Sequence, residues 1–284
     1  MLGPEIVARS MTLQRIADKF GNEWQYHPRS DRHSKVACWV VLLDLLLRCA
    51  LLRRHASEGK VAFGINHTMI DFTNGRQKNL DLVLCEPRSS DTPSRRPVTF
   101  ADLADRFEVA LTSDEQAELL ALPPLYRRDV GDVLLALEAK ACMTAHQKAG
   151  PRLYDELTSA WNCINGSAPQ AIAVGFGMVN ASEEFISPDR NRFSLAENPP
   201  VVNTEPQPAA ALGAHERIRA LRVRGHVNER GYDAVGILTV LARNDSTPIA
   251  LAPSPPGLSP SDPLHYERMI FRTAGLYDGR FAAR

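Results

Sequence analysis

The sequence predicts an α/β fold, a mixed central β-sheet flanked by α-helices. The first observation behind this prediction is the run Val36–Leu52, which is apolar almost all round and is typical of a helix buried at the centre of a domain. The second is a set of segments in which apolar and polar residues alternate, as they do in strands. Between residues 34 and 180 the predicted order is helix, strand, strand, insert, strand, helix, strand.

Length and composition indicate a chain that buries a substantial core. The 284 residues suit one large domain or two small ones, and 44% of them are hydrophobic. We divide the chain into a helical extension at residues 1–32 and a main domain at 33–284, with its core at 34–180 and a C-terminal decoration at 181–284. Lysine plus arginine equals aspartate plus glutamate, 33 against 33, so net charge neither favours nor excludes nucleic acid as a ligand.

Several features favour a cytoplasmic protein that does not enter a membrane. The first ten residues lack the apolar run of a secretory signal. Val36–Leu52 has about the length of a membrane span, but it contains Asp44 and Arg48, whose charges are costly in lipid and whose spacing would pair them on a helix. The five cysteines are odd in number and show no CxxC spacing, so we expect reduced thiols and neither a zinc site nor a disulfide framework.

The elements before the insert are two helices and a hairpin. Met1–Phe20 is predicted to be a short helix, and His33–Arg54 is predicted to be the central one. Two strands follow, Val61–Asp71 and Asn79–Cys85, because Asn74-Gly75 between them is a hairpin turn signal. The second strand, with the sequence NLDLVLC, places Leu80, Leu82 and Leu84 on one face and Asp81 on the other.

The insert covers Glu86–Arg128 and lies between the second and third strands of the core. Glu86–Thr99 is rich in proline, serine and arginine and is predicted to be a loop or a disordered segment. Phe100–Phe107 and Ser113–Leu122 are predicted helices, the latter because Ser113 with Gln116 has the spacing of a capping box.

The stretch Gly131–Cys142, with the sequence GDVLLALEAKAC, is the strand on which the functional prediction depends. Its alternation places Glu138 and Lys140 on one face, two residues apart, while Val133, Leu135, Leu137 and Ala139 form the opposite, apolar face. A carboxylate and an ammonium therefore lie side by side near the end of an otherwise apolar strand. The elements after it are predicted to be a helix at Met143–Trp161, a turn at Asn165-Gly166, a strand at Gln170–Asn180, a loop at Ser187–Gly213, a basic helix at Ala214–Val223, strands at Tyr232–Arg243 and Ile249–Leu251, and a helix at His265–Leu276.

An aspartate followed by Glu-x-Lys on neighbouring strands resembles the PD-(D/E)xK nuclease superfamily, to which many restriction endonucleases belong. The resemblance covers residues 34–180 and implies a restriction-endonuclease-like core in which Asp81 and Glu138 bind Mg²⁺, or Mn²⁺ in its place. In such proteins the residue between the glutamate and the lysine often supplies its backbone carbonyl as a further ligand, and here that residue is Ala139. The metal would neutralise the scissile phosphate and lower the pKa of a water, and Lys140 would orient that water or stabilise charge in the transition state.

The sequence departs from the superfamily pattern in two ways. The proline before the aspartate is Leu80 here, and 57 positions separate Asp81 from Glu138. Because of this long gap, Asp71, Asp129 and Asp132 compete with Asp81 for the role of first carboxylate. Asp132 shares the face of Glu138, but six residues of strand separate the two by roughly 20 Å, which is too far to share a metal.

Basic residues outside the motif are candidates for binding DNA. Lys148 and Arg152 are four apart, so one helical face presents both to a phosphate, unless that face is simply solvated. Arg217 and Arg222 belong to a basic run, His215–Arg230, which would either track a DNA backbone or form a solvated helix. That run also holds Arg219, Arg224 and Arg230, and the histidine nearest the motif, His146, is expected to be structural.

The resulting hypothesis is a Mg²⁺-dependent endodeoxyribonuclease that hydrolyses double-stranded DNA. The resemblance implies a role in restriction or antiviral defence, and cutting both strands usually calls for a homodimer. Two other classes stay open. One is a non-catalytic nucleic-acid-binding or scaffold protein with the same fold, and the other is a hydrolase acting on a different phosphoester.

Overall fold

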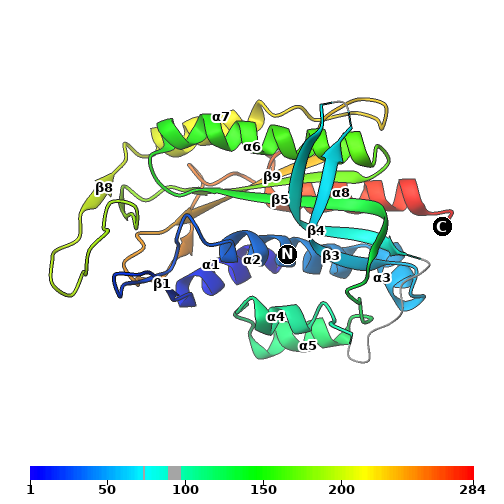
Figure 1. The fold of residues 1–284 in the computed structure, drawn as a ribbon, viewed down its shortest axis with the longest axis horizontal. Coiled ribbons are helices and arrows are strands. Elements are labelled where there is room, and N and C mark those ends of the chain that lie inside the picture. Colours follow the sequence, from blue (N-terminus) through cyan, green and yellow to red (C-terminus); the bar gives the residue numbers. More distant parts are fainter. Residues whose placement is uncertain (73, 89–96) are drawn as a thin grey trace.

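The computed structural model describes residues 1–72, 74–88 and 97–284. At its centre is a six-stranded mixed sheet with the strand order β10-β9-β6-β5-β4-β3 and helices on both faces (Figure 1). Strands β5, β6 and β9 run parallel to one another, whereas β3, β4 and β5 form an antiparallel meander. The prediction of a mixed sheet flanked by helices is confirmed. The strands are β3 (Ala62–Asp71), β4 (Arg76–Pro87), β5 (Val130–Cys142), β6 (Ile172–Asn180), β9 (Ala234–Leu241) and β10 (Ala250–Leu251).

Two hydrophobic clusters lie on opposite faces of the sheet. In β5 the predicted alternation holds from Leu135 onwards, because Leu135 and Leu137 join the first cluster and Ala136 joins the second. The predicted faces of Leu134 and Val133 are wrong, since Leu134 lies in the first cluster and Val133 packs against the second, where the register with β4 shifts. The first cluster is covered by α1 (Gly3–Leu13), α2 (Arg32–Arg48), α3 (Ala50–Ser57) and α8 (Tyr266–Phe281) and extends to α4 (Asp102–Arg106) and α5 (Ser113–Ala121). The second is covered by α6 (His146–Ser167) and α7 (Ala209–Arg219). Two small ribbons lie outside the main sheet, β1 (Ile16–Ala17) with β2 (Glu23–Trp24) and β7 (Glu184–Ile186) with β8 (Val202–Thr204).

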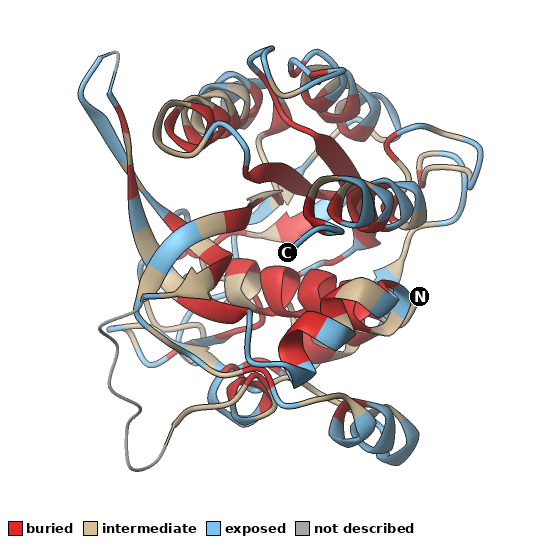
Figure 2. Ribbon diagram, turned by 90° about the vertical axis from the view of Figure 1, so that its right-hand side faces the viewer, coloured by how far each residue is buried: buried red, intermediate tan, exposed pale blue. Residues whose placement is uncertain are grey.

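Helix α2 is the central helix that the sequence predicts, and buried residues fill the layers around it (Figure 2). It ends at Arg48 because Cys49 is extended, and α3 starts directly afterwards. The predicted pairing of Asp44 with Arg48 is wrong. The Asp44 carboxylate instead accepts hydrogen bonds from the backbone N–H groups of Leu2 and Gly3 and from the Tyr266 hydroxyl, each at 2.9 Å, and so satisfies donors at the start of α1. Within the described residues, no helix combines the length and the apolar character needed to cross a membrane.

Residues 181–284, predicted to be a C-terminal decoration, contribute to the central sheet and to both of its faces. They supply β9 and β10 to the sheet, α7 to one face and α8 to the other. Strand β9 is buried at every position except its last, as expected of a parallel strand covered on both faces. The predicted loop at Ser187–Gly213 also contains β8 and the first turn of α7.

Several local predictions differ from the structure at helix ends. The capping box of α5 is formed by Thr112 and Glu115, one residue before the predicted pair of Ser113 and Gln116, because the extended residue that precedes the first turn is Thr112. Asn165-Gly166 lies within α6 and does not form a turn. Of the predicted loop at Glu86–Thr99, residues 89–96 lie outside the described residues.

The sheet opens between β4 and β5, and this opening positions the candidate site. The antiparallel register pairs Leu84 with Leu135 and Leu82 with Leu137 and then stops, whereas β4 continues to pair with β3. At the break β4 changes face: Leu82 and Leu84 lie in the first cluster, but Leu80 lies in the second. Their predicted common face is therefore wrong for Leu80. Beyond the break, the β3–β4 hairpin leans towards α6 (Figure 1).

The partner strand bends at the same point. Asn66 of β3 lies between the paired residues Ile65 and His67 and has φ +52°, a left-handed conformation that an asparagine adopts more readily than most residues. A residue in this conformation interrupts the regular pleat, as in a β-bulge, and increases the local twist. Asp81 stands opposite Asn66, between the partners of Ile65 and His67, and is half-buried where β4 leaves β5.

Candidate active site

Glu138 and Lys140 project from β5 towards α6, on the face that carries the second cluster. The Lys140 Nζ lies 2.8 Å from the Glu138 Oε1, so the predicted common face of these two residues is confirmed. Glu138 is only 1% exposed, and a carboxylate in such a position requires a compensating charge. The Lys140 ammonium supplies part of that charge.

Asp81 reaches from β4 across the opening to the backbone of β5. Its Oδ2 accepts a hydrogen bond from the backbone N–H of Ala139 at 3.2 Å, and its Oδ1 accepts one from the Ser34 hydroxyl at the start of α2, also at 3.2 Å. Burial, followed by the negative charge of Glu138, raises the pKa of Asp81 to about 6. The Glu138 carboxylate on β5 therefore affects the ionisation of the Asp81 carboxylate on the neighbouring strand β4.

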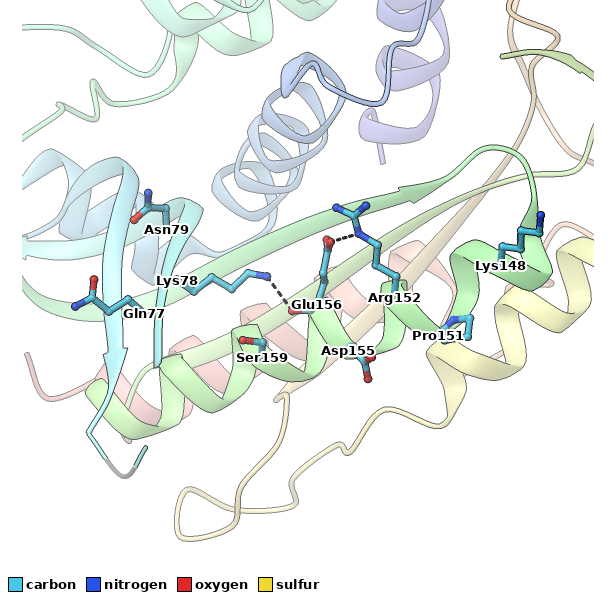
Figure 3. A pocket seen from close by; sticks show the side chains of 9 residues that line it. All are labelled: Gln77, Lys78, Asn79, Lys148, Pro151, Arg152, Asp155, Glu156 and Ser159. Atoms are coloured by element: carbon cyan, nitrogen blue, oxygen red, sulfur yellow. Dashed lines mark hydrogen bonds and ion pairs between the residues drawn. The ribbon is translucent and has the colours of Figure 1, made fainter. Parts of the chain in front are cut away.

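Lys78 is a second lysine in the site, and the sequence interpretation did not include it. Its Nζ lies 3.2 Å from the same Glu138 Oε1 and donates a hydrogen bond to the backbone carbonyl of Glu156 on α6 at 2.9 Å (Figure 3). Strict alternation would put Lys78 and Asp81 on opposite faces of β4, since they are three residues apart. The change of face at Asp81, which also moves Leu80, turns Lys78 towards α6.

Lys140 is charged at physiological pH. Burial alone would lower its pKa, but the Glu138 and Asp81 carboxylates outweigh that effect and raise it above the ordinary value of a lysine. An ammonium with a raised pKa cannot take a proton from water near neutral pH. Lys140 is therefore suited to hold a water or to stabilise negative charge, and not to act as a general base in this state.

A cleft of about 870 Å³ opens over Asp81 and Lys140, whereas Glu138 is buried behind them and does not line it. Asp81, Ala139 and Lys140 lie at its floor, and α6 contributes Lys148 and Arg152 to one wall. A second hollow of about 640 Å³ lies between β4 and α6 and shares Lys148, Arg152 and Glu156 with the first (Figure 3). The structure thus brings the two predicted phosphate ligands on α6 to the same cleft as the motif. Arg152 is paired with Glu156 at 2.6 Å, a partner four residues along the helix that its spacing could have indicated.

His33 is another cleft residue that the sequence interpretation missed. It follows the first residue of α2, and its ring packs against Tyr26 with the ring centroids 4.9 Å apart. Burial, followed by the Lys140 ammonium, lowers the pKa of His33 to about 4. The imidazole is therefore neutral at physiological pH and adds no positive charge to the cleft.

The basic run His215–Arg230 does not line this cleft. Arg217 lies against α6, where a Cβ on Gly150 would come within 2.4 Å of its Cδ, and Arg222 is exposed beyond the end of α7. Arg224 is buried and paired with Asp233 at 2.7 Å, so its guanidinium does not reach solvent. Arg219 is paired with Asp262 at 2.8 Å. Arg217 and Arg222 are the two residues of this run that are predicted from the sequence to bind DNA, and neither lines the cleft over Asp81 and Lys140.

The competing aspartates lie elsewhere. Asp71 is buried at the far end of the hairpin, where a Cβ on Gly166 would lie 2.8 Å from its Oδ1. Asp129 precedes β5 and Asp132 is exposed near its start, at the opposite end from Glu138. His146 is buried at the start of α6, where its Nε2 is 2.8 Å from the Asn180 carbonyl oxygen. Asp81 is thus the aspartate that shares the opening with Glu138.

The residues of the opening fit a hard divalent cation. The Glu138 Oε2 is buried and has no hydrogen-bond partner among the described residues, so one carboxylate oxygen is left for a further ligand. The carbonyl of Ala139 leaves the backbone on the same edge as its N–H, which points to Asp81. No group of three or more His, Cys, Asp or Glu side chains suited to a metal occurs in the described part of the chain. Mg²⁺ often uses only one or two carboxylates and completes its shell with waters and substrate phosphates.

Comparison of the chain with models of protein families, with curated proteins and with solved structures finds no match.

Proposed function

We propose that the protein is a Mg²⁺-dependent endodeoxyribonuclease that hydrolyses phosphodiester bonds of double-stranded DNA. One observation carries the proposal: where β4 leaves β5, Asp81 accepts a hydrogen bond from the backbone of Ala139, the residue between the paired Glu138 and Lys140, and Asp81 and Lys140 line a cleft. The order of strands and helices agrees with the restriction-endonuclease-like core that the Asp and Glu-x-Lys pattern resembles. By that resemblance the enzyme would act in the cytoplasm, in restriction or antiviral defence, and as a homodimer when both strands are cut.

Each residue has a role in this proposal. Asp81, Glu138 and the Ala139 carbonyl would hold Mg²⁺, which supplies positive charge to the scissile phosphate and favours ionisation of a water. Mn²⁺ would serve in its place. Lys140 keeps its proton, orients the attacking water and stabilises the charge that develops on the phosphoryl oxygens. Water would add to phosphorus in line with the bond to the 3′ oxygen and lose a proton to solvent, and as that bond breaks the 3′ oxygen would take a proton from solvent, so the products are a 5′ phosphate and a 3′ hydroxyl.

One observation favours a non-catalytic nucleic-acid-binding protein as the alternative. Both Lys78 and Lys140 contact the Glu138 Oε1, so the charge of this carboxylate is compensated within the chain itself. A site of that kind would be a structural ion pair beneath a binding cleft. The alternative predicts binding of DNA without hydrolysis, whatever divalent cation is added.

Digestion of plasmid DNA tests the proposal. We expect the wild-type protein to cut in millimolar Mg²⁺ and not in EDTA. Lys140→Ala should remove cleavage, because it removes the ammonium that orients the water and stabilises charge in the transition state, while DNA affinity in Ca²⁺ stays within about threefold of wild type. Lys140→Arg should fail as well, since a guanidinium is larger and planar.

Lys60→Ala is the matched control for these variants. Lys60 is half exposed, pairs with Glu58 and does not line the cleft, so the variant should cut at the wild-type rate. Wild-type protein that binds DNA but never cuts it, with Mg²⁺ or Mn²⁺, would rule out the nuclease and favour the alternative. Full cleavage by Lys140→Ala would exclude the role assigned to that residue.

A further inference from the structure

The wall of the cleft opposite α6 is built from two loops that lie far apart in the sequence. One loop precedes α2 and includes Tyr26 and Arg29, and the other follows β7 and includes Asp189 and Arg190. The Arg29 guanidinium lies 3.4 Å from the Asp189 carboxylate and joins the two loops across the surface. This wall faces the same space as Asp81 and Lys140.

Buried hydrogen bonds hold both loops in place. The Asn244 Oδ1 accepts a hydrogen bond from the backbone N–H of Tyr26 at 2.8 Å, and its Nδ2 donates to the carbonyls of Tyr26 and Ile186 at 3.0 and 2.9 Å. Asn191 fixes the second loop by donating to the carbonyls of Ser187 and Val201, both at 2.9 Å. The wall is therefore built before any ligand arrives, which lowers the entropic cost of binding.

Two of the cations that line the cleft have no carboxylate partner among the described residues. Three of its carboxylates already have partners, since Asp31 pairs with Lys35, Glu156 with Arg152 and Asp189 with Arg29. The fourth, Asp81, belongs to the site itself. Lys148 and Arg190 line the cleft from opposite walls, and in the described part of the chain neither has a carboxylate partner. Both are exposed, so their charges are available to an anion in the cleft.

We infer that Arg190 is a phosphate-binding residue that holds the substrate strand against the wall opposite α6, with Lys148 holding it from the other side. The inference rests on the proposed function and deepens it, because it places the sugar–phosphate backbone between two walls above Asp81 and Lys140. A phosphodiester backbone supplies negative charges on both sides of the scissile group, and each neutralised phosphate releases a counterion. It also replaces the assignment of phosphate contacts to the basic run 215–230, which lies away from the cleft.

The experiment measures binding of a fluorescein-labelled duplex DNA by anisotropy in EDTA, over a series of salt concentrations. Arg190→Ala should weaken binding about tenfold for every sequence tested and reduce the slope of log Kd against log salt by about one. Arg190→Lys should keep the wild-type slope, because it keeps the charge. Arg192→Ala is the matched control. Arg192 is an exposed arginine two positions away that pairs with Asp189 and does not line the cleft, so this variant should bind within about twofold of wild type.

Asp189→Asn tests the same wall through an expected gain in DNA affinity. Removing this carboxylate frees Arg29, which lines the cleft, and Arg192, which does not, so the variant should bind DNA more tightly than wild type and with a steeper salt slope. Damage to the fold would not produce a gain in affinity.

The failure of this inference is distinguishable from the failure of the proposed function. If wild type binds and cuts DNA while Arg190→Ala keeps the wild-type affinity and slope, the wall does not contact the substrate and only this inference falls. Equal weakening by Arg190→Ala and Arg192→Ala would overturn it too, because the effect would then reflect surface charge in general. If wild type binds no DNA at all, the proposed function falls and this inference falls with it.

Discussion

At the scale of single residues, the site depends on a hydrogen bond that the Asp81 side chain accepts from β5. In a regular sheet a backbone carbonyl of β4 would accept this hydrogen bond. Register between β4 and β5 ends at Leu82 and Leu137, and the next N–H along the opening, that of Ala139, is bonded by the Asp81 side chain and not by a β4 carbonyl. The carboxylate therefore completes the hydrogen bonding of β5 and places negative charge beside Glu138. The same group satisfies a backbone donor and, in the proposed function, would bind the cation.

Some of this arrangement follows from the sequence and some does not. Glu138 and Lys140 are two residues apart in a strand, and the period of two places them on one face in any register. Lys78 was missed because the same rule, applied to β4, puts it on the face away from Asp81. The rule fails there since the strand changes face at Asp81, opposite an asparagine with positive φ. An Asn at position 66 is compatible with such a bend but does not require it.

Asp81→Asn is expected to change how stability depends on pH in the metal-free protein. The pKa of Asp81 is raised to about 6 in the folded protein against about 4 in an unfolded chain, so the folded state holds the proton more tightly. The contribution of Asp81 to stability is therefore largest below pH 4 and is lost as the pH rises through 6, by roughly 3 kcal/mol at most. Asparagine never ionises, so the variant escapes this loss.

Thermal unfolding in EDTA between pH 4 and pH 7.5 measures the effect. The melting temperature of Asp81→Asn minus that of wild type should increase as the pH rises from 4 to 7, and the variant should melt at or above the wild-type temperature at pH 7. The exposed control Asp132→Asn should show no such trend. A difference for Asp81→Asn that does not vary with pH would contradict a raised pKa at this residue.

At the scale of elements, α6 connects the hairpin to the cleft. Its first turns carry Lys148 and Arg152, its middle accepts the hydrogen bond from Lys78, and its last turn packs against the far end of the hairpin at Asp71. The helix period predicted α6 correctly as an amphipathic helix, although it extends to Ser167 and not to Trp161. The Asn165-Gly166 pair suggested a turn because sequence alone cannot show that this glycine is required by packing.

The C-terminal strands were recognised as strands but not as part of the sheet. Local pattern identified Tyr232–Arg243 as a strand, and β9 lies within that range. Strand order depends on contacts between residues far apart in the chain, such as the pairing of Val174 with Ala234, and periodicity carries no information about them. The sequence cue was the lack of polar alternation in β9, which is typical of a strand with neighbours on both sides.

Two glycine substitutions test the packing of α6. A Cβ on Gly166 would lie 2.8 Å from the Asp71 Oδ1 and 3.0 Å from its backbone Cα, so Gly166→Ala should destabilise the protein by about 1–3 kcal/mol. Gly275 lies within α8 with nothing within 4 Å of its Cβ position, so Gly275→Ala should stabilise it by roughly 0.5–1 kcal/mol through helix propensity. Urea unfolding of both variants gives the two free energies. A stabilising Gly166→Ala would show that α6 does not pack closely on the hairpin.

At the scale of the whole molecule, the residues that stabilise the fold in the two hydrophobic clusters differ from those of the candidate site. The clusters fix the sheet and its helices, whereas the candidate site lies where the sheet opens and where burial and the negative charge of Glu138 raise the pKa of Asp81. A ligand that binds only to the folded protein stabilises it by RT ln(1 + [L]/Kd), about 2.7 kcal/mol at a hundredfold excess over Kd. Millimolar Mg²⁺ or Ca²⁺ should therefore raise the melting temperature.

The size of this shift and the residues that cause it can be tested together. For a chain of 284 residues each kcal/mol corresponds to roughly 2 °C, so saturating Ca²⁺ should raise the melting temperature by about 5 °C. Asp81→Asn removes one of the two carboxylates and should lose most of the shift. Asp71→Asn is the control, because Asp71 is buried at the far end of the hairpin: it should lower the melting temperature in EDTA and keep the full calcium shift.

If Asp71→Asn loses the shift while Asp81→Asn keeps it, the cation binds near α6 and Asp71 and not at the opening between β4 and β5. If wild type shows no shift with Mg²⁺, Ca²⁺ or Mn²⁺, Asp81 and Glu138 do not form a metal site.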